Sequence, residues 1–345
     1  MTASAFQITV EPSGRQFSTT DSETILAAAI TAGVGLPYGC KDGACGSCKC
    51  KKISGDVTHD TYSDNALTAA ELEAGFVLTC RATAHSDVVL ESRQVSSVNS
   101  FPVKKMPVRV GAFEKLSHDV MRVQLQLPAN NVFKYFAGQY LEFILRDGSR
   151  RAYSIATPPH VQETQPGIEL HIRHMPGGVF TGHVFGTMKE KEILRAEGPF
   201  GSFFLREDSD KPLVFLASGT GFAPIKGLLA HMQHQGITRP VSVYWGGRRP
   251  EDLYQNEWMQ ALAAAMPSVT YIPVISDALP EDHWTGRTGY VHQAVLDDFA
   301  DLSGYEVYAC GAPVVVDSAR SSYTTQRGLP EEAFFADAVT SAADK

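Results

Sequence analysis

The N-terminal hundred residues alternate apolar and polar positions in short runs. Residues 6–11 read Phe-Gln-Ile-Thr-Val-Glu, the alternation of a half-buried strand, and residues 16–19 can pair with them across Pro12-Ser13-Gly14. The apolar, Ala-rich run over residues 25–31 predicts a helix that Asp21 or Ser22 caps and Gly33 ends. Further elements are expected as strands over residues 50–53 and 88–90 and as a helix over residues 69–74 capped by Thr68. These elements predict a small sheet that holds one main helix.

The pattern changes twice further along the chain. Residues 93–107 lose periodicity and contain two prolines, which predicts a linker. Short strands then follow at close intervals, which favours an antiparallel barrel; they are expected over residues 108–110, 121–127, 139–145, 151–154 and 169–173. From Leu213 on, strands alternate with helices, the pattern of a parallel sheet covered on both faces. Its strands are expected over residues 213–217, 242–245, 270–275 and 307–310, with helices beginning at Ala223, Asp252, Tyr290 and Val314.

Four cysteines carry the first chemical signal. Cys40, Cys45 and Cys48 have the spacing C-x4-C-x2-C, and Cys80 follows far downstream. This is the plant-type ligand spacing of a [2Fe–2S] cluster, which needs four thiolates around two irons. Zinc sites usually repeat a close cysteine pair, and disulfide knots belong to small secreted domains, so both alternatives fit less well. Cys50 lies outside the ligand spacing and is expected to be a spare thiol.

Composition narrows the class of protein. A chain of 345 residues with 43% hydrophobic residues can build two or three buried cores. The net charge of −8 argues against nucleic acid as a partner, and no apolar run long enough to cross a membrane is present. Because four of six cysteines are assigned to the cluster and no signal peptide precedes them, a reducing, cytoplasmic location is expected.

Two motifs in the predicted barrel suggest an anionic cofactor. Arg151-Ala152-Tyr153-Ser154 lies on a strand, and Gly177-Gly178-Val179-Phe180-Thr181 stands between a strand and a helix. A helix N-terminus presents free N–H groups and the positive end of the helix dipole, so together with an arginine it can clamp a pyrophosphate.

These motifs, followed by Gly198-Pro199-Phe200-Gly201, resemble the flavin domain of the ferredoxin–NADP reductase superfamily. The resemblance implies FAD, with Arg151 on the pyrophosphate and Tyr153 against the isoalloxazine. It also implies Ser154 near the reactive N5 and the backbone from Gly177 and Gly178 through Val179 to Thr181 at the phosphates. In the same way, the N-terminal elements resemble the β-grasp fold of plant-type ferredoxins.

Two further turns indicate a pyridine nucleotide. Ser218-Gly219-Thr220-Gly221 joins a predicted strand to a helix with Pro224 in its first turn, and Cys310-Gly311-Ala312-Pro313 ends another strand. In the resembled superfamily both turns meet the nucleotide, and the cysteine lies near the carbon that gives up hydride, which implies a catalytic position for Cys310. Arg248 and Arg249 follow the second strand of this region. Glu251 and Asp252 offset their charge, so NADH is favoured as the donor, with NADPH possible.

The expected fold is therefore multidomain, α+β and α/β: a β-grasp ferredoxin over residues 1–97, a flavin-binding β-barrel over 98–207 and a Rossmann-like nucleotide domain over 208–345. This order resembles the reductase components of bacterial oxygenases and, through residues 43–48 and 244–248, the CDP-6-deoxy-glucoseen reductases of deoxysugar synthesis.

The expected function is an NAD(P)H-dependent reductase that passes electrons through FAD and the cluster to a partner protein, an oxygenase component or, alternatively, a sugar dehydratase. A redox-sensing regulator is the alternative from another class. His171 and His174 are expected to be barrel-wall residues.

Overall fold

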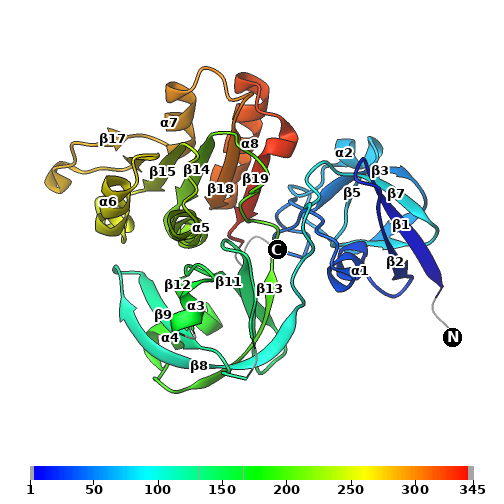
Figure 1. Cartoon of the computed structure of the whole chain (residues 1–345), viewed down its shortest axis with the longest axis horizontal. Coiled ribbons are helices and arrows are strands. Elements are labelled where there is room, and N and C mark those ends of the chain that lie inside the picture. The colour runs from blue at the N-terminus through cyan, green and yellow to red at the C-terminus, as the bar shows by residue number, and fades with distance from the viewer. Residues whose placement is uncertain (1–3, 131, 166, 341–345) are drawn as a thin grey trace. The chain divides into compact units, whose positions relative to one another are not determined.

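The computed structural model describes residues 4–130, 132–165 and 167–340 (Figure 1). Its contacts divide the chain into two compact units, and each is described by itself. Unit 1 contains residues up to Val103 together with Phe200–Phe203 and the segment from Asp337; unit 2 contains Lys104–Pro199 and Phe204–Ala336. None of the helices within the described ranges combines the length and the apolar character that a bilayer crossing requires.

Unit 1 is a five-stranded sheet that holds one main helix, as the alternation predicts. The strand order is β2-β1-β7-β3-β5, with β1 parallel to β7 and the other neighbours antiparallel. Its elements are β1 (Ala5–Glu11), β2 (Arg15–Thr20), α1 (Ile25–Ala32), β3 (Lys49–Ser54), β4 (Val57–His59), α2 (Ala69–Glu73), β5 (Phe76–Leu78), β6 (Ala82–Ala84) and β7 (Val88–Glu91).

The caps of these two helices only partly match the sequence prediction. Thr24 caps α1 by accepting the N–H of Ala27, so the prediction of Asp21 or Ser22 as the cap was wrong. Gly33 ends α1 in the left-handed conformation, as expected. Thr68 caps α2 in a reciprocal capping box with Glu71, also as expected.

The first part of unit 2 is a six-stranded antiparallel barrel. The strand order is β11-β10-β13-β8-β9-β12, and a bridge between Ile155 and Leu170 closes the ends. Strand β8 begins at Lys104, so the predicted linker over residues 93–107 is too long: its last residues already pair with β13. The elements are β8 (Lys104–Lys115), β9 (Val120–Gln126), β10 (Tyr140–Ile144), β11 (Arg150–Ser154), α3 (Val161–Thr164), β12 (Ile168–Arg173), α4 (Val179–Gly186) and β13 (Ile193–Phe200).

The second part of unit 2 is a sheet in the order β17-β16-β15-β14-β18-β19, with parallel pairing from β17 through to β18. Helices α7 and α8 pack on one face and α5 and α6 on the other (Figure 1). The elements are β14 (Leu213–Ser218), α5 (Phe222–Gln235), β15 (Val241–Gly247), α6 (Asn256–Ala265), β16 (Val269–Ile275), β17 (Arg287–Thr288), α7 (Val291–Asp298), β18 (Glu306–Gly311), α8 (Pro313–Arg327) and β19 (Phe334–Ala338). The helix expected at Asp252 begins later, because Pro250–Asp252 forms a 3₁₀ turn first.

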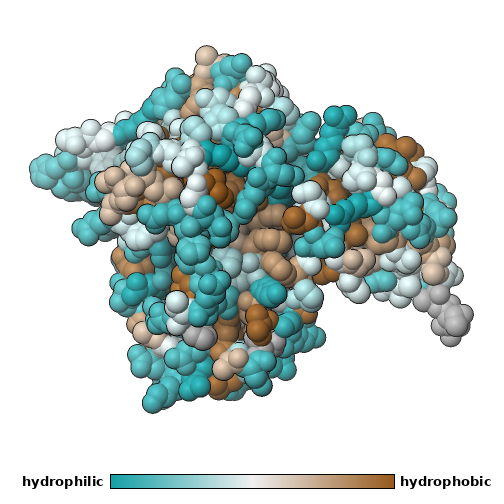
Figure 2. All heavy atoms as spheres, viewed as in Figure 1, coloured by the Kyte–Doolittle hydropathy of each residue, from teal (hydrophilic) through white to brown (hydrophobic). Residues whose placement is uncertain are grey.

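The surface is largely polar. Figure 2 shows hydrophilic residues over most of the visible face, with apolar residues in small groups between them. Strand β14 is apolar except for Ser218 at its end and is buried up to that residue, as expected for a central strand of a sheet covered on both faces.

Candidate functional site

The four predicted ligand cysteines lie together in unit 1, and none of them forms a disulfide. The Sγ atoms of Cys48 and Cys80 are 3.2 Å apart. In the same loop the N–H of Cys45 points to Sγ of Cys40 at 3.3 Å, and the N–H of Cys40 points to Sγ of Cys45 at 3.3 Å. Four unpaired sulfurs, with backbone N–H groups aimed at two of them, are the donor set of an iron–sulfur cluster, so the residues fit this group.

The four thiols differ in how readily they ionise. Hydrogen bonding to Cys40 lowers the pKa of the Cys45 thiol, and hydrogen bonding to Cys80 lowers that of Cys48. The same two hydrogen bonds, followed by burial, raise the pKa of Cys40 and of Cys80. Without a metal, two of the four thiols therefore resist ionisation. Binding iron to all four requires the release of their protons.

The glycines of the loop have a steric role. Gly46 has φ +71°, and an added Cβ there would lie 3.0 Å from the carbonyl oxygen of Ala66. Gly43 has φ +81°, and its Cβ would press on the side chains of Arg81 and Tyr62. These residues let the loop wrap closely around the four sulfurs.

Cys50 lies on β3 with its side chain buried, outside the ligand set. Burial, followed by the charge of Cys48, raises the pKa of its thiol to about 12. It is therefore a protonated, unreactive thiol near neutral pH.

In unit 2, aromatic packing brings the two predicted flavin motifs together. Tyr153 on β11 and Phe180 on α4 have ring centroids 5.5 Å apart, and Phe143 packs against both. Burial raises the pKa of Tyr153, so its hydroxyl stays protonated. The strand that carries Arg151, Tyr153 and Ser154 thus lies beside the first turn of α4.

The turn before α4 leaves space for a ligand to come close to the N-terminus of the helix. Gly178 is the N-cap, and Gly177 has φ +76° with open space where a Cβ would be. The hydroxyl of Thr181 bonds the backbone of Met175 at 3.1 Å as both donor and acceptor, which fixes the turn. Val179 is exposed, so the free N–H groups of the first turn lie at the surface of the barrel, where a phosphate can reach them. These features fit a pyrophosphate-containing cofactor.

The two predicted nucleotide turns meet at the carboxyl edge of the sheet. Gly221 follows β14 and contacts the backbone of Cys310 at the end of β18, so closely that any side chain at Gly221 would overlap the Cys310 carbonyl. Ser218 accepts the N–H of Ala312 at 2.9 Å and closes the same junction. This is the point where the strand order reverses, and open α/β sheets bind ligands at such points. Thr220, Gly311, Pro313 and the α5 residue Pro224 belong to the same turns.

Tyr254 is a residue that the sequence analysis missed. Its hydroxyl lies 3.0 Å from Nδ1 of His171, and Nε2 of His171 lies 2.7 Å from Oε1 of Glu169. Lys226 on α5 reaches the same carboxylate at 2.7 Å. Burial, with added contributions from Glu169 and Cys310, raises the pKa of Tyr254. This buried cluster joins the flavin barrel to the nucleotide sheet.

The protonation states of this cluster follow from its contacts. Burial lowers the pKa of His171. Burial alone would raise the pKa of Glu169, but the bonds from His171 and Lys226 bring it down to about 2. The histidine is therefore neutral: it donates from Nε2 to the carboxylate and accepts the tyrosine O–H at Nδ1. His171 lies on the barrel strand β12, as expected of a wall residue. Its side chain is on the face opposite to the barrel-core residues Leu170 and Ile172, where it bonds Tyr254 of the nucleotide part.

At the end of β15 the two predicted arginines differ in their surroundings. The side chain of Arg248 is exposed, and its Nε lies 3.7 Å from Asp252. Arg249 is held by both carboxylate oxygens of Asp282, at 2.7 and 2.8 Å.

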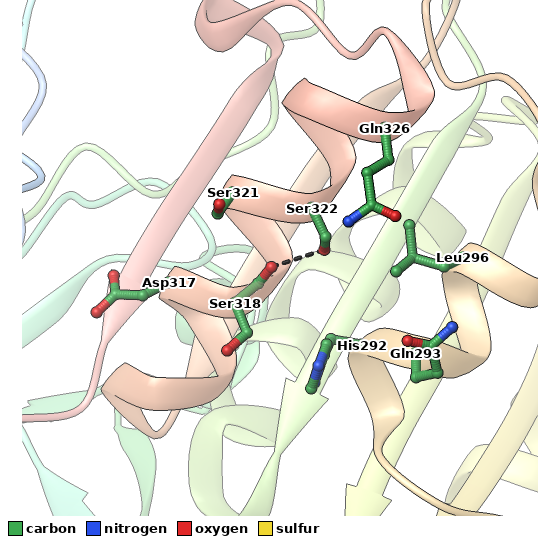
Figure 3. Close-up of a pocket in the computed structure, with 8 residues that line it drawn as sticks. All are labelled: His292, Gln293, Leu296, Asp317, Ser318, Ser321, Ser322 and Gln326. Atoms are coloured by element: carbon green, nitrogen blue, oxygen red, sulfur yellow. Dashed lines mark hydrogen bonds between the residues drawn. The ribbon is translucent and has the colours of Figure 1, made fainter.

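A surface pocket between α7 and α8 holds none of these residues (Figure 3). Its lining is polar apart from Leu296, and it consists of His292, Gln293, Leu296, Asp317, Ser318, Ser321, Ser322 and Gln326. The predicted cofactor residues lie elsewhere, on β11, in the first turns of α4, α5 and α8, and in the turns at the ends of β14, β15 and β18.

Comparisons with known families match three successive parts of the chain. Residues 8–85 match the 2Fe-2S iron-sulfur cluster binding domain, residues 107–205 the oxidoreductase FAD-binding domain, and residues 215–321 the oxidoreductase NAD-binding domain. These matches confirm the predicted order of modules and the predicted cofactors: a [2Fe–2S] cluster, FAD and NAD(H).

Relatives match over nearly the whole length of the chain. The chain is 39% identical over 337 residues to a CDP-6-deoxy-L-threo-D-glycero-4-hexulose-3-dehydrase reductase of Yersinia pestis, covering 97% of this chain and 98% of the relative. It is 34% identical to reductase component 1 of a terephthalate 1,2-dioxygenase from Comamonas, covering 96% of each. Among solved structures, an Amycolatopsis cytochrome P450 reductase, GcoB, has a TM-score of 0.78 at 30% identity and covers 98% of this chain and 99% of its own.

Proposed function

Because the chain belongs to the family of NAD(P)H-dependent iron–sulfur flavoprotein reductases, we propose that it delivers single electrons to a partner protein, an oxygenase component. When bound, FAD and the [2Fe–2S] cluster would supply the conversion of the electron pair of NAD(P)H into single electrons. The observation that carries the proposal is the set of four unpaired thiols, with Cys48 and Cys80 in contact. A reductase that passed hydride to a small substrate would need no such set.

Residues of the barrel would bind different parts of FAD. Arg151 and the first turn of α4, from Gly178 to Thr181, would hold the flavin pyrophosphate through charge and N–H groups. Tyr153 would pack on the isoalloxazine, because its ring is already fixed by Phe180. Ser154 would donate to or accept from the reactive edge of the ring.

The nucleotide would lie across the junction of β14 and β18. The turn Gly219-Thr220-Gly221 opens onto α5, and Gly311 and Pro313 open α8, so both turns can approach an anion with backbone N–H groups. Cys310 would stand beside the nicotinamide, where its small side chain leaves room for the ring. Exclusion of water there would protect the hydride, because Cys310 itself is buried.

The domain boundaries are part of the proposal. We place them after residues 97 and 207, and the three family matches fall inside the resulting segments. The barrel strand β8 then begins a few residues after the first boundary.

A second candidate acceptor is a dehydrase of deoxysugar synthesis. It is favoured by the 39% identity to the Yersinia pestis dehydrase reductase. A redox-sensing regulator gains no support from the three matches, which are all to electron-transfer domains.

The experiment is a reconstitution with purified acceptors under anaerobic conditions. The protein, reduced with NADH, is mixed with the oxygenase component of a terephthalate dioxygenase or with a CDP-6-deoxyhexulose dehydrase, and reduction of each acceptor is followed by its absorbance. Faster reduction of the oxygenase supports the proposal, and faster reduction of the dehydrase supports the second candidate. Cytochrome c reduction without transfer to either protein would reject both acceptors while leaving the reductase chemistry intact.

A further inference from the structure

Charged residues gather at the carboxyl end of β15, and the sequence does not show which of them form ion pairs. In dinucleotide-binding sheets, the residues after the second strand meet the adenosine ribose: an acid there binds the 2′-hydroxyl of NAD, and an arginine accepts the 2′-phosphate of NADP. Strand β15 is the second strand of this sheet and pairs directly with β14. Arg248 and Arg249 follow it at once. By position alone, this edge has the cations that NADPH requires.

The structure shows that one of these two cations, Arg249, already forms an ion pair within the protein. Asp282, in the 3₁₀ turn Pro280–Asp282, accepts hydrogen bonds from Nε and Nη2 of Arg249 at 2.8 and 2.7 Å. The geometry is bidentate, which is the strongest arrangement for a guanidinium and a carboxylate. Asp282 also accepts the N–H of Leu279 at 2.8 Å, so its carboxylate is held in place from a second side. A phosphate would have to displace this carboxylate to use the same two donors.

Arg248 is the second cation at this edge, and its Nε lies 3.7 Å from Asp252; the other charged groups beside the pair are acidic. The carboxylate of Asp252 accepts the backbone N–H groups of Arg248 and Arg249 at 2.8 and 3.1 Å. These bonds fix the carboxylate beside the end of β15. Asp277 lies beside them, because its N–H bonds the carbonyl of Arg248. Asp277 and Glu281 both add negative potential at Arg249. A 2′-phosphate carries about 1.5 to 2 negative charges near neutral pH, so it would meet repulsion from these carboxylates as well as the loss of Arg249.

We infer that the Arg249–Asp282 pair sets the donor specificity of this reductase, by withholding Arg249 from a 2′-phosphate and so selecting NADH over NADPH. This inference rests on the proposed function, because it assumes that the nucleotide crosses the β14–β18 junction toward β15. Selection of this kind acts against the wrong ligand more than it adds contacts to the right one.

The test measures kcat/KM for NADH and for NADPH with ferricyanide as the acceptor, so that no partner protein is needed. The variant Asp282→Asn keeps an oxygen for the Leu279 N–H but removes the charge that holds Arg249. The expected result is a rise of at least about tenfold in kcat/KM for NADPH, with the value for NADH changed less than about twofold. The matched control is Asp297→Asn, which weakens a surface pair with Arg287 in the same domain and should change neither value.

Two further variants separate the causes. In the double variant Asp282→Asn/Arg249→Ala the gain for NADPH should disappear, because the released guanidinium is its source. Arg249→Ala alone should not raise kcat/KM for NADPH, because the Asp282 carboxylate stays and loses the cation that offsets its charge. This readout holds even if Asp282→Asn folds poorly. A tenfold rise in kcat/KM for NADPH in Arg249→Ala would overturn the inference, as would a wild type that prefers NADPH or an unchanged ratio in Asp282→Asn. Wild-type protein that oxidises neither nucleotide would instead reject the proposed function.

Discussion

The ring of Phe222 stacks on the indole of Trp245, with centroids 3.8 Å apart and planes within 9° of parallel. Both side chains are fully buried beneath the turn that follows β14. The indole Nε1–H of Trp245 donates to the carbonyl oxygen of Gly219 at 3.1 Å. The stack and this bond together hold the Gly219-Thr220-Gly221 turn in the shape that the nucleotide would meet.

Replacing Trp245 by Phe should therefore weaken nucleotide binding. The ring stack is kept in part, but the Gly219 carbonyl loses its donor, at a cost of about 1 kcal/mol, or roughly a fivefold rise in KM for NADH. Flavin and cluster absorbance should not change. Steady-state kinetics with ferricyanide check this, with Trp258→Phe as the control because its ring touches Phe222 edge-on. An unchanged KM in Trp245→Phe would show that the bond does not shape the turn.

Metal and flavin content test the cofactor assignment directly. Protein purified without air should contain two irons and one FAD per chain and no zinc, because four thiolates in this loop match a [2Fe–2S] cluster. Metal analysis and the visible spectrum give both numbers from one sample. Stoichiometric zinc without iron would reject the cluster.

Removal of one cysteine ligand should affect two electron acceptors differently. Cys80→Ser takes one thiolate from the set, so the cluster should be lost while the flavin barrel and nucleotide sheet keep their own cores. NADH oxidation with ferricyanide, which takes electrons from flavin, should persist, and reduction of cytochrome c should fall most of the way to background.

The matched control for that variant is Cys50→Ser. Cys50 is buried and protonated, and it lies outside the ligand set, so both activities should stay near the wild-type level. A Cys80→Ser protein without iron that still reduces cytochrome c at the wild-type rate would identify the flavin as the exit point for electrons.

The buried His171 gives unit 2 a pH-dependent stability. Its folded pKa lies below the ordinary value of 6.5, so the unfolded chain takes up a proton first as the pH falls. The stability that comes from keeping this histidine neutral is present above pH 6.5 and decreases below it. Glu169, with a pKa of about 2 against an ordinary 4.5, adds a second loss that begins below pH 4.5.

The temperature of flavin release, followed by its fluorescence, should therefore drop between pH 7.5 and pH 5.5. In His171→Gln the drop should be smaller, although the variant is less stable at pH 7.5. His85→Gln is the control, since this histidine is exposed in unit 1. An equal drop in His171→Gln and wild type would assign the pH dependence to other groups.

The sequence predicts a structural feature well where that feature depends on neighbouring residues. The C-x4-C-x2-C spacing of Cys40, Cys45 and Cys48, the Gly33 stop and the Thr68 cap each depend on residues close together in the chain, and the structure contains each of these local features. The cap of α1 was missed because Asp21 and Ser22 are as good N-caps as Thr24 by residue type. The start of β8 was missed because Pro107 and two lysines hide its alternation.

Contacts between distant segments could not be read from the sequence. His171 and Tyr254 are 83 positions apart, and Arg249 and Asp282 are 33 apart. No motif pairs them, and each residue alone is an ordinary barrel, loop or surface residue. Only the contacts of the folded chain show β12 against Tyr254 and α5, and the 3₁₀ turn Pro280–Asp282 against the end of β15.

Helix α5 begins at the nucleotide turn and, one turn later, places Lys226 on the Glu169 carboxylate of the barrel. Gly227 follows, where a Cβ would lie 3.2 Å from the carbonyl oxygen of Ile155. The two cofactor domains are thus not freely interchangeable parts. A chimeric reductase that joined this nucleotide domain to a relative's barrel would leave the largely buried Lys226 without its counterion, unless the exchange also carried Glu169 and His171.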